Sequence, residues 1–204
     1  MRIGIFGGSF DPPHIGHLIL AAECRYQLGL DRVLWVVTPI PPHKPGRKLT
    51  PVELRFEMVT AAIGDDPTFE ASRVEMERSA PYFTADTLEI LRERYPRAEL
   101  ILLMGGDSLH DLPTWHDPQR LVRVCDGIGV MRRLGAELDV DALDAKLPGL
   151  RGKLTIVEAP LLEISSSQIR GRIREGKPFR YYVPTGVYDQ ILRQELYQGE
   201  EVFN

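Results

Sequence analysis

The fold is decided near the start of the chain, where residues 2–18 read RIGIFGGSFDPPHIGHL. Arg2–Phe6 is an apolar run of strand length, Gly7–Pro13 is rich in turn-forming residues, and His14 opens an apolar helical pattern. A strand, a glycine turn and a helix in this order favour phosphate binding, because the helix N-terminus carries free N–H groups and about half a positive charge. His14 and His17 lie three residues apart and therefore share one helix face. Two imidazoles beside an anion site indicate chemistry on a phosphate group.

The rest of the chain alternates strand and helix patterns. We expect strands over Arg2–Phe6, Arg32–Val37, a short piece near Phe69, Glu99–Met104, Gly127–Met131 and Lys153–Val157. We expect helices over Ile15–Leu28, Pro51–Ile63, Ala85–Arg94, Pro118–Val124, Ser166–Glu175 and Gly186–Tyr197, and a short one near Val140–Leu147. This order predicts an α/β fold, namely a Rossmann-like, doubly wound, mostly parallel sheet with helices on both faces. Ligands of such sheets bind beyond the carboxyl ends of the strands, where the strand order reverses.

Residues 1–204 are expected to form a single domain, with a small C-terminal helical subdomain of about residues 165–204. Three helices have explicit start signals. Thr50 before Pro51 and Glu53 predicts a capping threonine followed by a first-turn proline and an acidic residue, and Asp117 before Pro118 repeats the cap and the proline. Thr84 is expected to cap the helix that follows it.

Composition limits the class of protein. The net charge of −4 argues against nucleic acid as the main partner, because nucleic-acid-binding domains are usually basic. Cys24 and Cys125 are far apart, so we expect neither a disulfide framework nor a zinc site. The sequence shows no targeting leader and no apolar run long enough to cross a bilayer, so we expect a cytoplasmic protein with no membrane partner. A homo-oligomer is compatible with the sequence, which does not give the oligomeric state.

A second candidate anion site lies late in the chain, where Ile164 to Arg170 read ISSSQIR. The hydroxyl and backbone groups of Ser165 and Ser166 converge at a helix start, and Arg170 follows one turn later. An ordinary serine cap is the alternative interpretation. We expect this segment and the one around His14 to meet in space and to hold one polyanion between them.

The segment Gly7–His17 resembles the nucleotidylyltransferase signature G-x-F-D-P-x-H-x-G-H, and the late serines match the I-S-S-x-x-I-R motif of the same superfamily. In that superfamily both motifs contact the triphosphate of ATP or CTP. The resemblance implies that His14, His17 and Arg170 are the catalytic residues. It implies ATP contacts at Gly7, Gly8, Ser9, Phe10, Asp107, Ile164, Ser165 and Ser166.

From Met1 to about Leu192 the chain resembles bacterial nicotinate-nucleotide adenylyltransferase. Four segments carry this resemblance in the right order: a P-H-K loop, T-x-D-T-L, G-x-D-x-L…W and I-S-S-S-x-I-R. The resemblance implies that Lys44 binds the mononucleotide phosphate, that backbone N–H at Thr84 binds the nicotinate carboxylate, and that Trp115 stacks on the pyridine ring. Without the resemblance, Lys44 is a lysine exposed to solvent and Thr84 is a simple helix cap. Gly105-Gly106 is then a sharp turn after a strand, and Trp115 is a buried tryptophan. The chain departs from the pattern at Tyr82-Phe83, where many members have Ser-Tyr, and at His110-Asp111, where an aromatic residue is frequent.

The implied reaction transfers AMP from ATP to nicotinate mononucleotide and forms deamido-NAD and pyrophosphate in NAD biosynthesis. Mg²⁺ would be bound mainly through the ATP phosphates, with no protein metal ligand. The acceptor phosphate, whose second pKa is about 6, is already anionic at neutral pH and needs no general base. We expect an anionic ligand to raise the histidine pKa values above about 6.5.

Three alternatives stay open. Another nucleotidylyltransferase, acting on pantetheine phosphate or using CTP, shares the histidine motif. Residues 14–17 also spell the HIGH motif of class I aminoacyl-tRNA synthetases, although the chain is short, is acidic and has no lysine-rich second motif. A non-catalytic nucleotide sensor would need the same binding residues.

Overall fold

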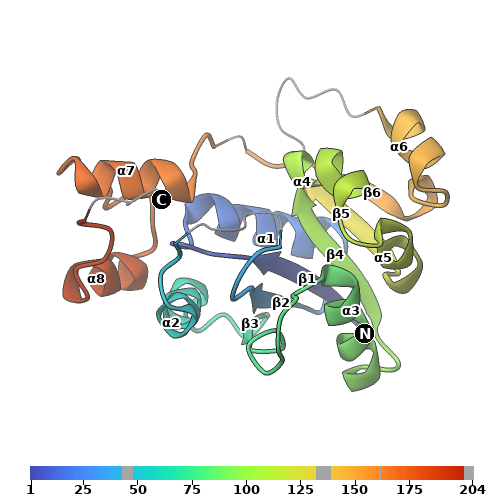
Figure 1. Cartoon of the computed structure of the whole chain (residues 1–204), viewed down its shortest axis with the longest axis horizontal. Helices are drawn as coiled ribbons and strands as arrows, with labels where there is room; N and C mark the ends of the chain where they lie inside the picture. Colours follow the sequence, from blue (N-terminus) through green and yellow to red (C-terminus); the bar gives the residue numbers. More distant parts are fainter. Residues whose placement is uncertain (43–47, 132–138, 161, 200–204) are drawn as a thin grey trace.

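The computed structural model describes residues 1–42, 48–131, 139–160 and 162–199. Within these ranges six parallel strands form one sheet in the order β3-β2-β1-β4-β5-β6 (Figure 1). The strands are β1 (Arg2–Gly8), β2 (Arg32–Val37), β3 (Phe69–Ser72), β4 (Glu99–Gly105), β5 (Gly127–Met131) and β6 (Leu154–Val157). The predicted Rossmann-like parallel sheet is confirmed. Its order reverses between β1 and β4, which puts the expected ligand crevice at the carboxyl ends of these two strands.

Helices follow most of the strands. They are α1 (Ile15–Gln27), α2 (Val52–Ile63), α3 (Thr84–Arg94), α4 (Gly106–Asp111), α5 (Pro118–Val124), α6 (Val140–Lys146), α7 (Ser166–Arg174) and α8 (Thr185–Arg193). Two short 3₁₀ turns complete the described part, η1 (Leu112–Thr114) and η2 (Arg151–Lys153). No helix in the described ranges is long and apolar enough to span a membrane.

Each face of the sheet has its own core, because successive strand residues point to opposite sides. Ile3 and Ile5 of β1 pack in a cluster that includes Leu88 of α3, together with residues of α4 and α5. Phe6 belongs to a second cluster with Cys24 and other residues of α1. Helices therefore cover both faces, as expected.

A third core joins the C-terminal helices to α2. It contains Met58 and Ala62 of α2, Ile169 of α7, and Val187 and Ile191 of α8. In Figure 1, α7 and α8 lie together at one end of the molecule, next to α2. This packing brings the late serine segment back to the N-terminal loop.

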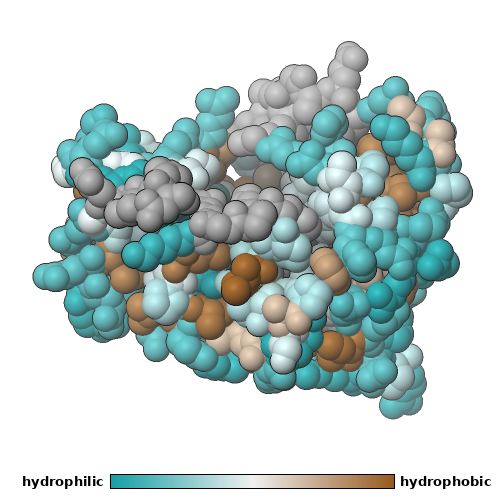
Figure 2. Space-filling model, viewed as in Figure 1, coloured by the Kyte–Doolittle hydropathy of each residue, from teal (hydrophilic) through white to brown (hydrophobic). Residues whose placement is uncertain are grey.

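The surface seen in Figure 2 is mostly hydrophilic, with hydrophobic residues gathered in patches near the centre of the view. Large apolar side chains that stand out from the described surface include Tyr26 and Tyr181. Single exposed apolar residues of this kind are common on folded proteins and identify no ligand.

Two of the predicted helix starts are wrong by one residue. Pro51, not Thr50, is the N-cap of α2, and the Thr50 carbonyl accepts a hydrogen bond from Arg55 Nε instead. Phe83, not Thr84, is the N-cap of α3, and its carbonyl accepts from Arg78. In the first case the arginine side chain binds the carbonyl of the expected cap itself, and in the second it binds the carbonyl of the residue before the expected cap.

Two further local expectations can be compared with the structure. The cap at Asp117 is confirmed, because its carboxylate accepts a hydrogen bond from the Arg120 amide at 3.1 Å. Without the family resemblance, the sequence indicated a sharp turn after β4, where the structure has the short helix α4. The glycine pair there suggested a turn, but a glycine can begin a helix as well as a turn.

The fold makes a testable prediction at Gly129 in β5. A Cβ atom at this position would lie 2.5 Å from Leu28 Cδ1 and 3.1 Å from Leu103 Cδ2, and both leucines are buried. Gly129→Ala must therefore disturb the packing between the sheet and the end of α1. We expect a loss of about 1–3 kcal/mol in the free energy of unfolding, measured by urea denaturation.

Gly152→Ala in η2 is the matched control, because a Cβ atom there would meet no atom within 4 Å. Its effect should stay within about 0.5 kcal/mol. Equal losses in the two variants would contradict this account of β5 packing.

Candidate active site

Two adjoining cavities open at the carboxyl ends of β1 and β4. The first cavity, of about 410 Å³, is lined by residues that include Gly7, Gly8, Thr38, Glu75, Tyr82, Thr84, Thr87, Gly105 and Trp115. The second cavity, of about 370 Å³, is lined by Phe10, Asp11, His14, Ile164, Ser165, Ser166, Ser167 and Arg170. Ser9, His17 and Asp107 line both cavities, so the two form one continuous site.

The structure brings the two expected anion-binding segments together. Ser166 Oγ donates a hydrogen bond to the Pro12 carbonyl at 2.8 Å. Arg170 Nη1 donates to the Asp11 carbonyl at 2.7 Å, and Arg170 Nη2 donates to Ser167 Oγ at 3.1 Å. The expected meeting of these segments, more than 150 residues apart in the sequence, is therefore confirmed.

His14 and His17 form a stacked pair at the start of α1. Their ring centroids lie 3.7 Å apart with an interplanar angle of 29°. The His14 amide donates to His17 Nδ1 at 3.1 Å, so the proton of a neutral His17 sits on Nε2. The pair thus offers one imidazole whose tautomer is set by the backbone and whose Nε2–H is a hydrogen-bond donor.

Burial keeps both imidazoles uncharged at neutral pH. Desolvation lowers the pKa of His14 to about 4. The pKa of His17 is also lowered well below its usual value, first by burial and then by the charge of neighbouring His14. Before any anion binds, the pair is therefore neutral, and the positive charge that a bound triphosphate favours is not yet present.

The start of α1 differs from the expectation of free amide groups. The His14 amide is bound to the His17 ring, the Ile15 amide donates to the Tyr182 carbonyl at 3.0 Å, and the His17 amide donates to the His14 carbonyl. The sequence-based view that this helix offers free N–H groups is wrong for these three residues. These three amides are therefore not available to an anion.

Phe10 lines the second cavity, but its side chain belongs to the core and is only 2% exposed. Its ring packs at 5.1 Å from the His17 ring and at 5.2 Å from the Trp35 ring. Its φ of 48° lies in the left-handed region that non-glycine residues rarely adopt. In this conformation the Phe10 ring packs edge-on against the His17 ring.

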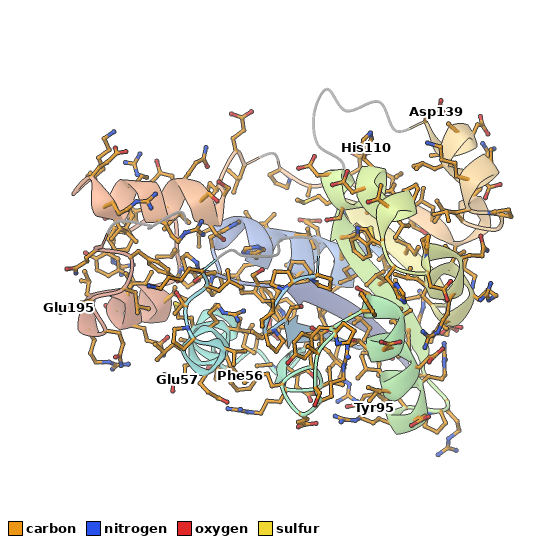
Figure 3. All side chains as sticks on the ribbon, viewed as in Figure 1. Phe56, Glu57, Tyr95, His110, Asp139 and Glu195 are labelled. Carbon is orange, nitrogen blue, oxygen red and sulfur yellow. The ribbon has the colours of Figure 1, made fainter. Side chains whose placement is uncertain are left out.

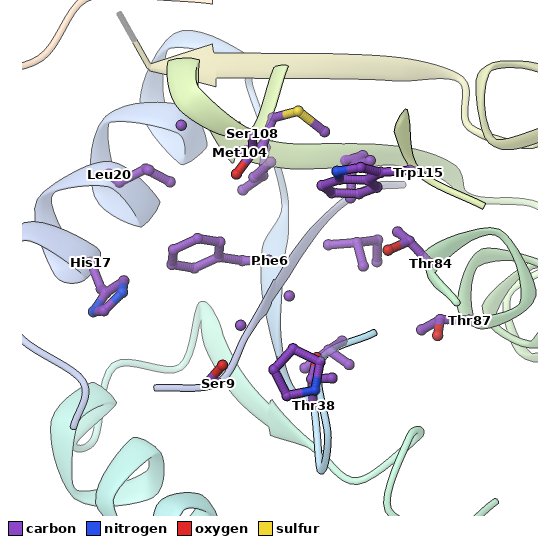
Figure 4. A pocket seen from close by; sticks show the side chains of 18 of the residues that line it. Phe6, Ser9, His17, Leu20, Thr38, Thr84, Thr87, Met104, Ser108 and Trp115 are labelled. Atoms are coloured by element: carbon purple, nitrogen blue, oxygen red, sulfur yellow. The ribbon is translucent and has the colours of Figure 1, made fainter. Parts of the chain in front are cut away.

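The other side of the first cavity is built by α3 and by the segment after η1. Figure 4 shows Thr84, Thr87 and Trp115 opposite His17, with Phe6 between them. The Phe83 ring stacks on the His116 ring at 3.8 Å, which fixes the start of α3 against the segment that carries Trp115. The site is therefore long, with histidines at one end and a tryptophan at the other.

The two departures from the family pattern have different locations. Tyr82 lines the first cavity, whereas Phe83 is occupied by its stack on His116. Asp111 is 66% exposed and pairs with His110 at 3.2 Å, so its carboxylate points to solvent. Lys44, expected to bind the mononucleotide phosphate, lies outside the described residues.

Sequence reasoning missed Glu75, a buried carboxyl group in the wall of the first cavity. Thr87 Oγ1 donates to Glu75 Oε1 at 2.6 Å. Burial raises the pKa of Glu75, and the Thr87 hydrogen bond opposes this rise. Its place just beyond the end of β3 was the available signal, because the carboxyl ends of parallel strands meet at one sheet edge.

A parallel sheet of this strand order, with a cavity at its switch point lined by histidine, serine and arginine side chains, is the architecture of the Rossmann-like nucleotide-binding proteins. Residues 5–172 match the model of the cytidylyltransferase-like family. The chain is 45% identical over 200 residues to the "Probable nicotinate-nucleotide adenylyltransferase" of Thermomicrobium roseum, covering 98% of this chain and 93% of that protein. It therefore belongs to the nicotinate-nucleotide adenylyltransferase family within the cytidylyltransferase-like proteins.

Other relatives agree with this assignment. A protein of the same name from Dehalococcoides mccartyi is 41% identical over 198 residues, which cover 97% of each chain. Among solved structures, Plasmodium falciparum nicotinic acid mononucleotide adenylyltransferase complexed with NaAD superposes with a TM-score of 0.80. That chain is 22% identical, and the match covers 100% of this chain and 98% of the other, so the likeness shows the fold.

The buried imidazole of His14 predicts acid-linked instability. Unfolded His14 binds a proton near pH 6.5, whereas folded His14 binds it near pH 4. The unfolded state holds more protons between these pH values, so the free energy of unfolding falls as the pH drops from 6.5 to 4. At about 1.4 kcal/mol per pKa unit, His14 accounts for about 3 kcal/mol of this fall.

Urea denaturation of the wild type and of His14→Gln at pH 7 and pH 4 measures this linkage. The variant should lose less stability than the wild type between the two pH values, because glutamine takes up no proton. Parallel losses would show that His14 is not buried in its neutral form.

Proposed function

We propose that this protein transfers the AMP part of ATP to nicotinate mononucleotide, forming deamido-NAD and pyrophosphate in NAD biosynthesis. The observation that carries the proposal is the continuous site, in which two cavities share Ser9, His17 and Asp107. One end has donors for a polyanion, and the other has an indole ring. The full-length relatives named for this activity support the same conclusion.

We infer that the triphosphate of ATP lies in the second cavity. His14, His17 and Arg170 line it and can donate hydrogen bonds to phosphate oxygens. The hydroxyl proton of Ser166 is directed to the Pro12 carbonyl, and Ser165 is the N-cap of α7. These serines would therefore serve chiefly by fixing the first turn of α7, whose positive dipole end lies at the cavity.

The chemistry requires no general base. A phosphate oxygen of the acceptor forms a bond to the α-phosphorus of ATP, the bond from that phosphorus to the bridging oxygen breaks, and pyrophosphate leaves with the electron pair. Both reacting groups are anions, so catalysis depends on positioning and on neutralising the charge that develops on the departing phosphates. His17 Nε2–H and the Arg170 guanidinium would supply donors for that charge.

Magnesium would be held mainly by the nucleotide. Among the described residues, no group of three or more histidine, cysteine, aspartate or glutamate side chains is placed to hold a metal ion. Asp107 is the carboxylate that lines both cavities. A cation carried by ATP phosphates and water suits this donor set, with Asp107 as the protein group that would face it, and it would neutralise phosphate charge.

We propose that the first cavity receives the nicotinate mononucleotide. The Trp115 indole offers a stacking surface for the pyridine ring. Thr84 is the first residue of α3, and the positive end of this helix dipole favours a carboxylate over a neutral carboxamide. Lys44 would bind the phosphate of the mononucleotide.

We also propose that the chain folds as one domain. Helix α2 contributes Val59 to the core on the sheet face that also contains Phe6 and Cys24, and Met58 to the core of the C-terminal helices. Neither core is complete without this helix, so the C-terminal helices are an extension of the sheet domain. Cys24 and Cys125 are both buried free thiols, which suits the reducing cytoplasm that we propose as the location.

Pyrophosphate release with a panel of acceptors tests the proposed function. With ATP and Mg²⁺, we expect turnover with nicotinate mononucleotide and a product with the mass of deamido-NAD. The kcat/KM for nicotinamide mononucleotide should be lower by about tenfold or more, because the start of α3 favours a negative charge. Equal values would reject this selectivity, and turnover only with pantetheine phosphate or CTP would reject the proposed reaction.

His17→Ala tests the catalytic end of the site. Loss of one donor to the transition state should lower kcat by about 10²–10³-fold. His110→Ala is the matched control, because His110 is 85% exposed, lines neither cavity and points away from the sheet in Figure 3. Near-normal kcat in folded His17→Ala, or an equal loss in His110→Ala, would contradict the assignment.

A further inference from the structure

Arg55 of α2 is a buried cation that the reaction scheme does not use. Its side chain is 1% exposed, and its guanidinium donates hydrogen bonds to four backbone carbonyls. The acceptors are Ser9 at 2.7 Å, Thr38 at 2.8 Å, Pro39 at 2.7 Å and Thr50 at 2.7 Å. Four of its five N–H donors therefore end on main-chain carbonyls, which lie between 5 and 46 residues away in the sequence.

These carbonyls belong to the two loops that border the site. Ser9 follows β1 and lines both cavities, whereas Thr38 follows β2 and lines the first cavity. Pro39 continues from Thr38, and Thr50 lies just before α2. The Thr38 amide also donates to the Gly8 carbonyl at 2.9 Å, so the loops meet where the strands end.

The positive charge of Arg55 is balanced by a carboxylate of the Ser9 loop, that of Asp11. Burial lowers the pKa of Arg55, and the Asp11 carboxylate opposes this effect. Asp11 is itself buried, and its Oδ1 accepts a hydrogen bond from the Tyr197 hydroxyl at 2.8 Å. Tyr197 comes from the segment after α8, so a C-terminal residue helps to hold the counter-charge in place.

The planar guanidinium suits this task better than other side chains do. Its rigid fork can bind several carbonyls at fixed angles, whereas a lysine ammonium is a point charge with at most three donors. A hydrophobic residue would leave four carbonyls without this partner. A purely stabilising role would require only that each carbonyl has a hydrogen-bond donor. Arg55 does more, because its Nη1 atom binds the carbonyls of both Ser9 and Thr38 and so joins the two loops.

We propose that Arg55 is a positioning residue for the transfer reaction, because it fixes the Ser9 loop, which borders the triphosphate end, against the Thr38 loop, which borders the acceptor end. This inference rests on the proposed function. Arg55 lines neither cavity and so acts through the loops. Its loss should misplace two bound anions relative to each other more than it weakens the binding of either.

Arg55→Lys tests the inference in the full-length enzyme with ATP, Mg²⁺ and nicotinate mononucleotide. We expect kcat to fall by about 10²-fold, as a displacement of about 1 Å between reactants can cause. The KM values for both substrates should stay within about threefold of the wild type, because uniform binding is retained. All rates are measured at one temperature at which circular dichroism shows each variant to be folded.

Val59→Ala is the matched control on the same helix. Val59 is fully buried one turn after Arg55 and belongs to the apolar core. The Val59→Ala variant should have a lower melting temperature, while its kcat stays within about twofold of the wild type. A kcat for Arg55→Lys within about threefold of the wild type would overturn the inference, and so would an equal loss of kcat in Val59→Ala.

Tyr197→Phe gives an independent measurement if the arginine variants do not fold. It removes one hydroxyl without opening a large cavity, and we expect kcat to fall by about three- to tenfold with little change in either KM. An unchanged kcat would count against the proposal. A wild-type enzyme that forms no dinucleotide would instead reject the proposed function, whereas an active wild type with fully active variants rejects only the role of Arg55.

Discussion

The contact between the first loop and α7 is the interaction on which the site depends. The carbonyls of Asp11 and Pro12 accept hydrogen bonds from Arg170 and Ser166, which lie at the other end of the sequence. Without these bonds, the second cavity would lose one wall and its buried guanidinium. The third hydrophobic core, shared by α2, α7 and α8, holds α7 at the right place for these bonds to form.

Burial gives the site its electrostatic character. The second cavity combines two neutral imidazoles and the Arg170 guanidinium with the carboxyl groups of Asp11 and Asp107. In this low-dielectric environment a hydrogen bond or a charge acts more strongly than it does in water. The His14 amide fixes the His17 tautomer, and Phe10 supports the His17 ring, so the donor is oriented before a ligand arrives.

Much of the architecture could be predicted from local patterns. The expected bounds of the strands Arg32–Val37 and Gly127–Met131 agree with the structure, because continuous apolar runs between turn residues are typical of buried parallel strands. The cap at Asp117 was predictable for a similar reason, since a cap depends on groups only three residues apart. The caps expected at Thr50 and Thr84 were wrong by one residue, and at both helix starts an arginine side chain binds a backbone carbonyl, a contact that the cap pattern does not include.

The sequence by itself determined the order of strands and helices, the glycine turn with its two histidines and the late serine segment, because each of these is encoded in neighbouring residues. Only the tertiary structure decided the strand order, the bond from the Ile15 amide to the Tyr182 carbonyl, and the contacts of Arg55 with the carbonyls of Ser9, Thr38 and Pro39. These features join groups that are distant in the chain. Their partners are selected by packing and burial, which no local pattern specifies.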